Sequence, residues 1–133
     1  MLVGKQVYLL RNESKRGLGF FDANNFYPDF ILWILDGEKQ YITFIDPKGI
    51  RNLKGLEDDK IQLFKYLQTD VASLLGNAHL MLNSFIISNT PMEQVEFWLK
   101  NPFEKGEFQK NHVLFKDDKG YLDTMVNMIL QYI

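Results

Sequence analysis

The chain contains no cysteine among its 133 residues and only two histidines, His79 and His112. Without cysteine, disulfide bonds, CxxC redox chemistry and zinc sites built from thiolates are all excluded. The two histidines are far apart in the sequence and lack the spacing of paired metal ligands. These absences remove the classes of protein that depend on sulfur chemistry.

Long apolar runs and a strong charge of one sign are also missing. No apolar stretch reaches the roughly 18 residues that a membrane-spanning helix needs. The start of the chain lacks the apolar core and cleavage site of a signal peptide, so we expect a cytoplasmic protein without a membrane partner. The formal net charge of −2 argues against a generally basic nucleic-acid coat protein. A nuclease stays open, because its site needs only carboxylates and a local basic rim.

Apolar material for a core is abundant, with 46% hydrophobic and 14% aromatic residues, which argues against global disorder. The length suits one domain, which we take as residues 1–133. An antiparallel meander followed by αβ crossovers predicts an α/β fold with a mixed sheet flanked by helices. The apolar patterns predict strands at residues 5–12, 18–22, 26–35, 40–45, 79–88 and 112–115, and helices at 57–76, 92–100 and 121–133.

The segment Asp46-Pro47-Lys48-Gly49 supports two interpretations. It matches a type I β-turn, with Asp at the first position, Pro at the second and Gly at the fourth. If the strand instead stays extended, Asp46 and Lys48 point to the same side, because side chains alternate between the two faces. The interpretations are compatible, since the chain can turn at Pro47 and still present both charged residues.

A second aspartate, Asp29, lies near the start of the preceding strand. With a four-residue hairpin loop, Leu35 pairs with Gln40 and Asp29 lies opposite Asp46. A two-residue loop directly after Leu35 leaves the aspartates diagonal on one face, whereas a three-residue loop separates them unless a bulge intervenes. Hairpins of even length therefore bring the two carboxylates within about 5–8 Å.

Two neighbouring carboxylates repel each other and lose hydration, so a compensating group is needed. A divalent cation provides it, and hard oxygen ligands select Mg²⁺ or Mn²⁺. Lys48 would stand beside this cation, where it could activate the attacking water or stabilise the transition state. The trio Asp29, Asp46 and Lys48 suits the hydrolysis of a phosphodiester.

Pro28-Asp29 followed by Asp46-x-Lys48 on the next strand resembles the PD-(D/E)xK nuclease motif. The order of elements is similar to the restriction-endonuclease-like core of that superfamily. The resemblance implies that Asp29, Asp46 and the backbone carbonyl of Pro47 bind the metal, and that Lys48 assists catalysis. Many members carry another acid on a helix before the first strand, and we assign no residue of this chain to that role.

The residues over 26–49 look most like the C-terminal nuclease domain of type III restriction subunits and related DEAD/DEAH-type helicases. This resemblance implies that the chain is the C-terminal part of a larger restriction or helicase-linked enzyme with an N-terminal helicase/ATPase region. It also implies DNA as the substrate, with RNA left open.

Gln62 and Tyr66 resemble the QxxxY helix motif of the RecB-like branch, because residues four apart share a helix face. An ordinary solvated face explains them equally well. Five basic residues flank the proposed site in sequence and could contact phosphates: Arg11, Lys15, Arg16, Arg51 and Lys54. For each of them a solvated charged loop is the plainer explanation.

The sequence thus leads to a Mg²⁺-dependent (endo)nuclease domain. The alternative is a nuclease-like fold without catalysis that serves nucleic-acid binding or scaffolding. A small-molecule phosphodiesterase is a third class, but no pocket signature in the sequence points to it.

Overall fold

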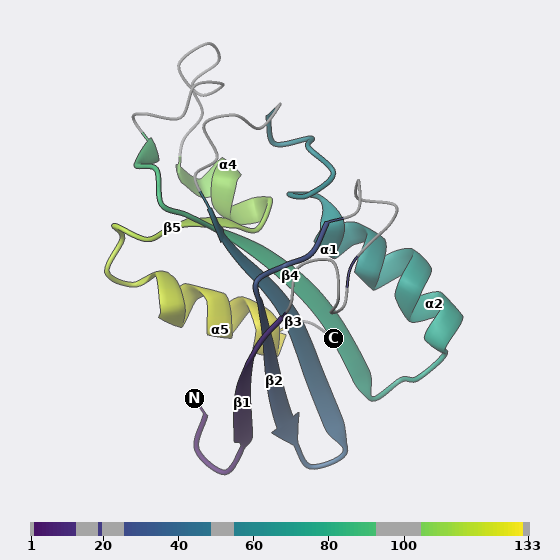
Figure 1. Ribbon diagram of the computed structural model, residues 1–133. Helices are drawn as coiled ribbons and strands as arrows, with labels where there is room; N and C mark the ends of the chain where they lie inside the picture. Colours follow the sequence, from purple (N-terminus) through teal and green to yellow (C-terminus); the bar gives the residue numbers. More distant parts are fainter. Residues whose placement is uncertain (1, 13–18, 20–25, 49–54, 93–104, 132–133) are drawn as a thin grey trace.

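The computed structural model describes residues 2–12, 19, 26–48, 55–92 and 105–131 (Figure 1). Its strands are β1 (Gln6–Arg11), β2 (Phe30–Asp36), β3 (Lys39–Lys48), β4 (Leu80–Ser88) and β5 (Val113–Phe115). Its helices are α1 (Leu63–Tyr66), a π-helical segment (Leu67–Val71), α2 (Ala72–Leu75), α4 (Lys105–Lys110) and α5 (Tyr121–Gln131). No helix within these ranges combines the length and the apolar composition needed to cross a bilayer.

The strands form one mixed sheet in the order β1-β2-β3-β4-β5. β1, β2 and β3 pair antiparallel, whereas β3, β4 and β5 pair parallel. Parallel neighbours need a crossover connection, which the helical stretch from α1 to α2 supplies between β3 and β4. The predicted α/β class, a mixed sheet flanked by helices, is confirmed.

The hairpin between β2 and β3 sets the register on which the sequence argument depends. Leu35 pairs with Gln40 and Phe30 pairs with Ile45, so the next position places Asp29 opposite Asp46. Of the registers left open, the one expected for a four-residue loop is therefore observed. The loop itself is shorter, because Asp36 and Lys39 also pair and leave a two-residue turn. Gly37 has a φ of 60° there, which suits the first central position of a type II′ turn.

Strand β3 continues through the Asp-Pro-Lys segment. Asp46, Pro47 and Lys48 pair with Ile86, Ile87 and Ser88 of β4. A type I turn that begins at Asp46 is therefore wrong for these residues. Pro47 lies beyond the last pair between β2 and β3, which fits the rule that proline avoids positions where both neighbouring strands need hydrogen bonds.

Each face of the sheet carries its own hydrophobic cluster. Phe64 of α1 and Leu67 of the π-helical segment cover one face, where they pack together with Phe44 and Ile86 of the sheet. α5 lies on the other face, where its buried residues join Ile34, Ile45 and Phe85 (Figure 1). Asp46 shares the α1 side with Phe44, because alternate residues of a strand face the same way.

The end of the crossover helix exposes two large apolar side chains. Leu74 and Leu75 lie at helical spacing from the buried Leu67 in the helix predicted over 57–76, yet they are 84% and 54% exposed. The π-helical segment explains the difference, because it has more residues per turn than an α-helix and rotates all later side chains around the axis. The helix ends where predicted, at Gly76, which has a left-handed φ of 59°.

Some predicted elements fall outside the described residues. These are the strand over 18–22, of which only Gly19 is described, and most of the helix over 92–100. Conversely, helix α4 was not predicted from the sequence. The helix is short, contains Gly106 and buries only Phe108, so its amphipathic pattern is weak.

Candidate active site

The carboxylate of Asp46 is the buried charge at the centre of the candidate site. Asp46 is 4% exposed, although ionised carboxylates strongly prefer water. Its Oδ1 accepts a hydrogen bond from the backbone N–H of Asp29 at 3.1 Å. This bond joins the two predicted site residues across the open end of the β2–β3 hairpin.

The end of β1 holds Asp29 in place from the other side. The backbone N–H of Asn12 donates to the carbonyl of Asp29 at 2.8 Å, and Asn12 Nδ2 donates to the carbonyl of Pro28 at 2.9 Å. The Pro28–Asp29 peptide is therefore held by two side chains, those of Asn12 and Asp46, and the main chain of Asn12 holds the carbonyl of Asp29. Sequence reasoning missed Asn12, because a single asparagine after a strand carries no recognisable signal.

The remaining motif residues lie on the same strand as Asp46. Pro47 and Lys48 are paired with β4, so the backbone of the whole Asp-x-Lys segment is extended. Pro47 lines a cavity on the α5 side of the sheet, the opposite face from Asp46. The side chain of Lys48 lies outside the described part of the structure, and its role stays a prediction.

Gln62 lies just before α1 and ties this helix to its surroundings. Its Nε2 donates to the carbonyl of Leu56 and to Oδ1 of Asn111, the latter at 2.8 Å. Its Oε1 is buried without a hydrogen-bond partner among the described residues. Tyr66 packs against the α1-side cluster. The solvated-face interpretation is thus wrong for Gln62, which is half-buried and pinned between segments.

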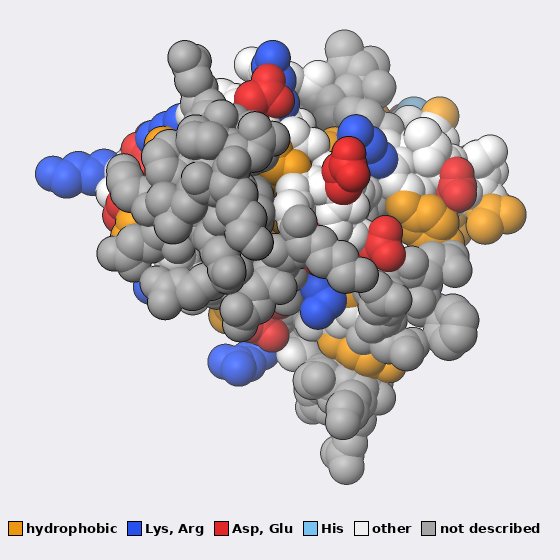
Figure 2. Space-filling view, turned by 90° about the horizontal axis from the view of Figure 1, so that it is seen from above, with side chains coloured by type: hydrophobic (Ala, Val, Ile, Leu, Met, Phe, Trp, Pro, Cys, Tyr) orange, Lys and Arg blue, Asp and Glu red, His pale blue; other side chains and the backbone are white. Residues whose placement is uncertain are grey.

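Of the five basic residues predicted to contact phosphates, the structure describes one. Arg11 is exposed at the end of β1, and its guanidinium lies 5.8 Å from the centre of the Phe30 ring. The other four basic residues, Lys15, Arg16, Arg51 and Lys54, lie outside the described residues. On the face seen in Figure 2, acidic and basic side chains of the described residues are intermixed.

His112 is a structurally important residue that sequence reasoning did not single out. Its ring is stacked between those of Phe64 and Phe85, with centroid distances of 3.6 and 4.5 Å. Burial lowers the pKa of His112 to about 4, against the opposing effect of its hydrogen bond with the carbonyl of Ser84. The ring is therefore neutral at pH 7, and its backbone has the unusual φ of 61°.

The donor set around Asp46 is made of oxygen atoms. The carboxylates of Asp29 and Asp46 and the carbonyl of Pro47, the predicted ligands, are hard oxygen donors of the kind that Mg²⁺ and Mn²⁺ prefer. Within the described ranges, no group of three or more His, Cys, Asp or Glu side chains gathers in one place. The metal site stays a prediction that rests on two carboxylates and one carbonyl.

Comparisons of the chain with protein-family models, with curated proteins and with solved structures find no match.

Proposed function

We propose that this chain is a Mg²⁺-dependent nuclease domain of the PD-(D/E)xK type, with a restriction-endonuclease-like core. The support from the fold is its topology. A three-stranded antiparallel meander is followed by a helical crossover to a parallel fourth strand, which agrees with the order of elements in that core.

The observation that carries the proposal is the contact between Asp29 and Asp46. Asp29 lies directly before β2 and Asp46 lies in the neighbouring β3, and the 3.1 Å bond from the Asp29 main-chain N–H to Asp46 Oδ1 joins them. Carboxylates are rarely buried in protein folds, and Asp46 is 4% exposed. A divalent cation bound between two neighbouring carboxylates would stabilise both of them.

The residues divide into two roles in this proposal. Asp29, Asp46 and the carbonyl of Pro47 hold the metal, and Lys48 assists the attacking water or the developing charge. The bound cation supplies Lewis-acid polarisation of the phosphate. DNA is the proposed substrate, and an N-terminal helicase/ATPase region of a larger protein is the proposed partner.

The sharpest test is Asp46→Asn, because an asparagine Oδ1 still accepts the hydrogen bond from Asp29 while the charge is lost. We expect metal-dependent cleavage of DNA to fall by about 10²–10³-fold, with the folded structure retained in circular dichroism. Asp36→Asn is the matched control. Asp36 lies at the other end of the same hairpin, where its Oδ2 is 3.7 Å from Nζ of Lys5. Removing the charge of Asp36 should leave cleavage unchanged.

Cleavage that persists at the wild-type level in Asp46→Asn contradicts the proposal. A second candidate function, a nuclease fold without catalysis, is favoured by the fact that Asp46 already accepts a structural hydrogen bond. Calorimetric titration with Mg²⁺ and Mn²⁺ distinguishes the two: the catalytic proposal requires binding that Asp46→Asn abolishes. DNA binding without metal binding supports the second candidate.

A further inference from the structure

β1 forms the edge of the sheet, and among the described residues no strand lies beyond it (Figure 1). All six of its residues are exposed. Four of them are large and apolar: Val7, Tyr8, Leu9 and Leu10 are 42%, 49%, 62% and 46% exposed. An edge strand of this kind is a template for pairing with another strand, and proteins usually block it with proline, inward-pointing charges or a covering segment.

The hydrogen bonds at the end of β1 show which residues offer their main chain to a partner. The N–H of Asn12 donates to Asp29, so Asn12 directs its main-chain groups toward β2. The direction alternates along an antiparallel strand. Val7, Leu9 and Arg11 therefore direct their N–H and C=O groups to the outer edge.

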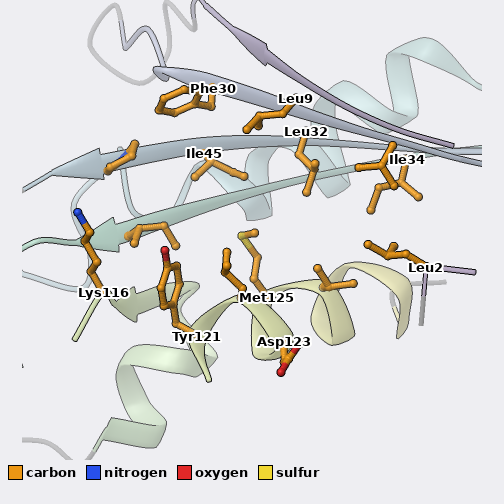
Figure 3. A pocket seen from close by; sticks show the side chains of 15 residues that line it. Leu2, Leu9, Phe30, Leu32, Ile34, Ile45, Lys116, Tyr121, Asp123 and Met125 are labelled. Atoms are coloured by element: carbon orange, nitrogen blue, oxygen red, sulfur yellow. The ribbon is translucent and has the colours of Figure 1, made fainter. Parts of the chain in front are cut away.

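The side chains of β1 are exposed on both faces of the sheet. Val7 and Leu9 line an apolar groove of about 500 Å³ beside α5, together with Phe30 and Leu32 of β2 (Figure 3). Tyr8 lies on the opposite face, because neighbouring residues alternate. The helices thus leave β1 uncovered on both sides, and a partner strand would bury apolar side chains on both faces at once.

We propose that the partner is a second copy of this chain, joined through an antiparallel β1–β1 pair that extends the sheet across a two-fold axis. Such an axis stands perpendicular to the sheet and requires one residue to pair with its own copy. We place this centre at Leu9, whose outward N–H and C=O groups then exchange two hydrogen bonds with Leu9 of the second copy.

The overlap of the two strands and their charges together favour this centre. Within the bounds of β1, pairs centred at Leu9 or Tyr8 overlap more of the strand than pairs centred at Val7 or Leu10. With Leu9 at the centre, Tyr8 lies opposite Leu10 and Val7 lies opposite Arg11, so no like charges meet. With Tyr8 at the centre, Lys5 would lie opposite Arg11, and like charges directly opposite each other destabilise a strand pair. The only charge within β1 is Arg11, so two copies of the strand pair in this register without charge repulsion. The proposal does not depend on the nuclease function.

Analytical ultracentrifugation tests the proposal from about 1 to 500 µM protein, a range suited to the weak end of specific interfaces. We expect a reversible dimer for the wild type and a monomer for Leu9→Lys, which sets two ammonium groups opposite each other. Leu74→Lys is the matched control, since Leu74 is 84% exposed on α2, and it should dimerise like the wild type. A wild type that is monomeric throughout, or a Leu9→Lys that dimerises equally well, overturns the proposal.

The absence of cysteine makes the register testable with single thiols. In the Leu9-centred pair, the Cα atoms of the two copies of residue 9 lie about 5.5 Å apart, within disulfide range. Leu9→Cys should therefore cross-link on mild oxidation. In Tyr8→Cys the two copies are offset by two residues along the strands, so their Cα atoms lie more than about 7 Å apart and the thiols should stay unlinked. The opposite result overturns the register, and a dimer that links through neither thiol overturns pairing through β1.

Discussion

β1 and β4 belong to the same sheet and both contain apolar runs, yet they have opposite environments. In β4 every residue from Leu82 to Ser88 is buried, whereas every residue of β1 is exposed. The difference comes from position, because β4 lies between two strands with a helix on each face and β1 has one strand neighbour among the described residues. An apolar composition therefore indicates a strand but not whether the strand lies in the centre or at the edge.

The largest expected effect comes from truncating a side chain in the central strand. Phe85 is 2% exposed and stacks on His112, so Phe85→Ala should lower the free energy of unfolding by about 3–5 kcal/mol. Leu9→Ala in β1 should cost less than about 1 kcal/mol. Urea denaturation at low protein concentration measures both. Equal losses would mean that β1 is covered in solution.

The second effect is a pH dependence that arises beside β4. Because the pKa of His112 is about 4 in the folded chain, an unfolded chain with an ordinary histidine pKa near 6.5 binds a proton that the folded chain does not. Stability is therefore full above about pH 6.5 and falls as the pH drops toward 4, by up to about 3 kcal/mol.

Denaturation curves of His112→Asn at several pH values check this dependence. Asparagine tolerates the left-handed backbone of this position, and the variant should lose the part of the pH dependence that His112 causes. His79→Asn is the control, because His79 is exposed in a turn, and it should behave like the wild type. An unchanged slope in His112→Asn would show that the imidazole is not held neutral.

The smallest effect concerns the end of β1, where the strand is pinned although its middle is exposed. Asn12→Ala removes the bond from Nδ2 to the carbonyl of Pro28, which should cost about 1 kcal/mol. Asn77→Ala, in an exposed turn, should cost less. Thermal unfolding of both variants measures the difference, and equal values would show that the contact with Pro28 contributes nothing to stability.

The sequence allowed the β2–β3 hairpin to be predicted, because strand alternation and a glycine turn are local signals. Its register was left open between loop lengths, and Asp29 and Asp46 were expected as neighbours for every loop of even length. The stack of His112 between Phe64 and Phe85 could not be predicted, since its three rings come from segments that only the tertiary fold brings together. The exposure of Leu74 could not be predicted either, because no local sequence pattern indicates the π-helical segment.

Asp46 and Pro47 are joined by a single peptide bond but serve opposite sides of the sheet. The first residue is buried on the α1 side, and the second lines the apolar groove beside α5. The backbone of β3 alone therefore separates the carboxylate on one face from the apolar groove on the other. A mutation that changes the packing of Pro47 in the groove also shifts the backbone that carries Asp46.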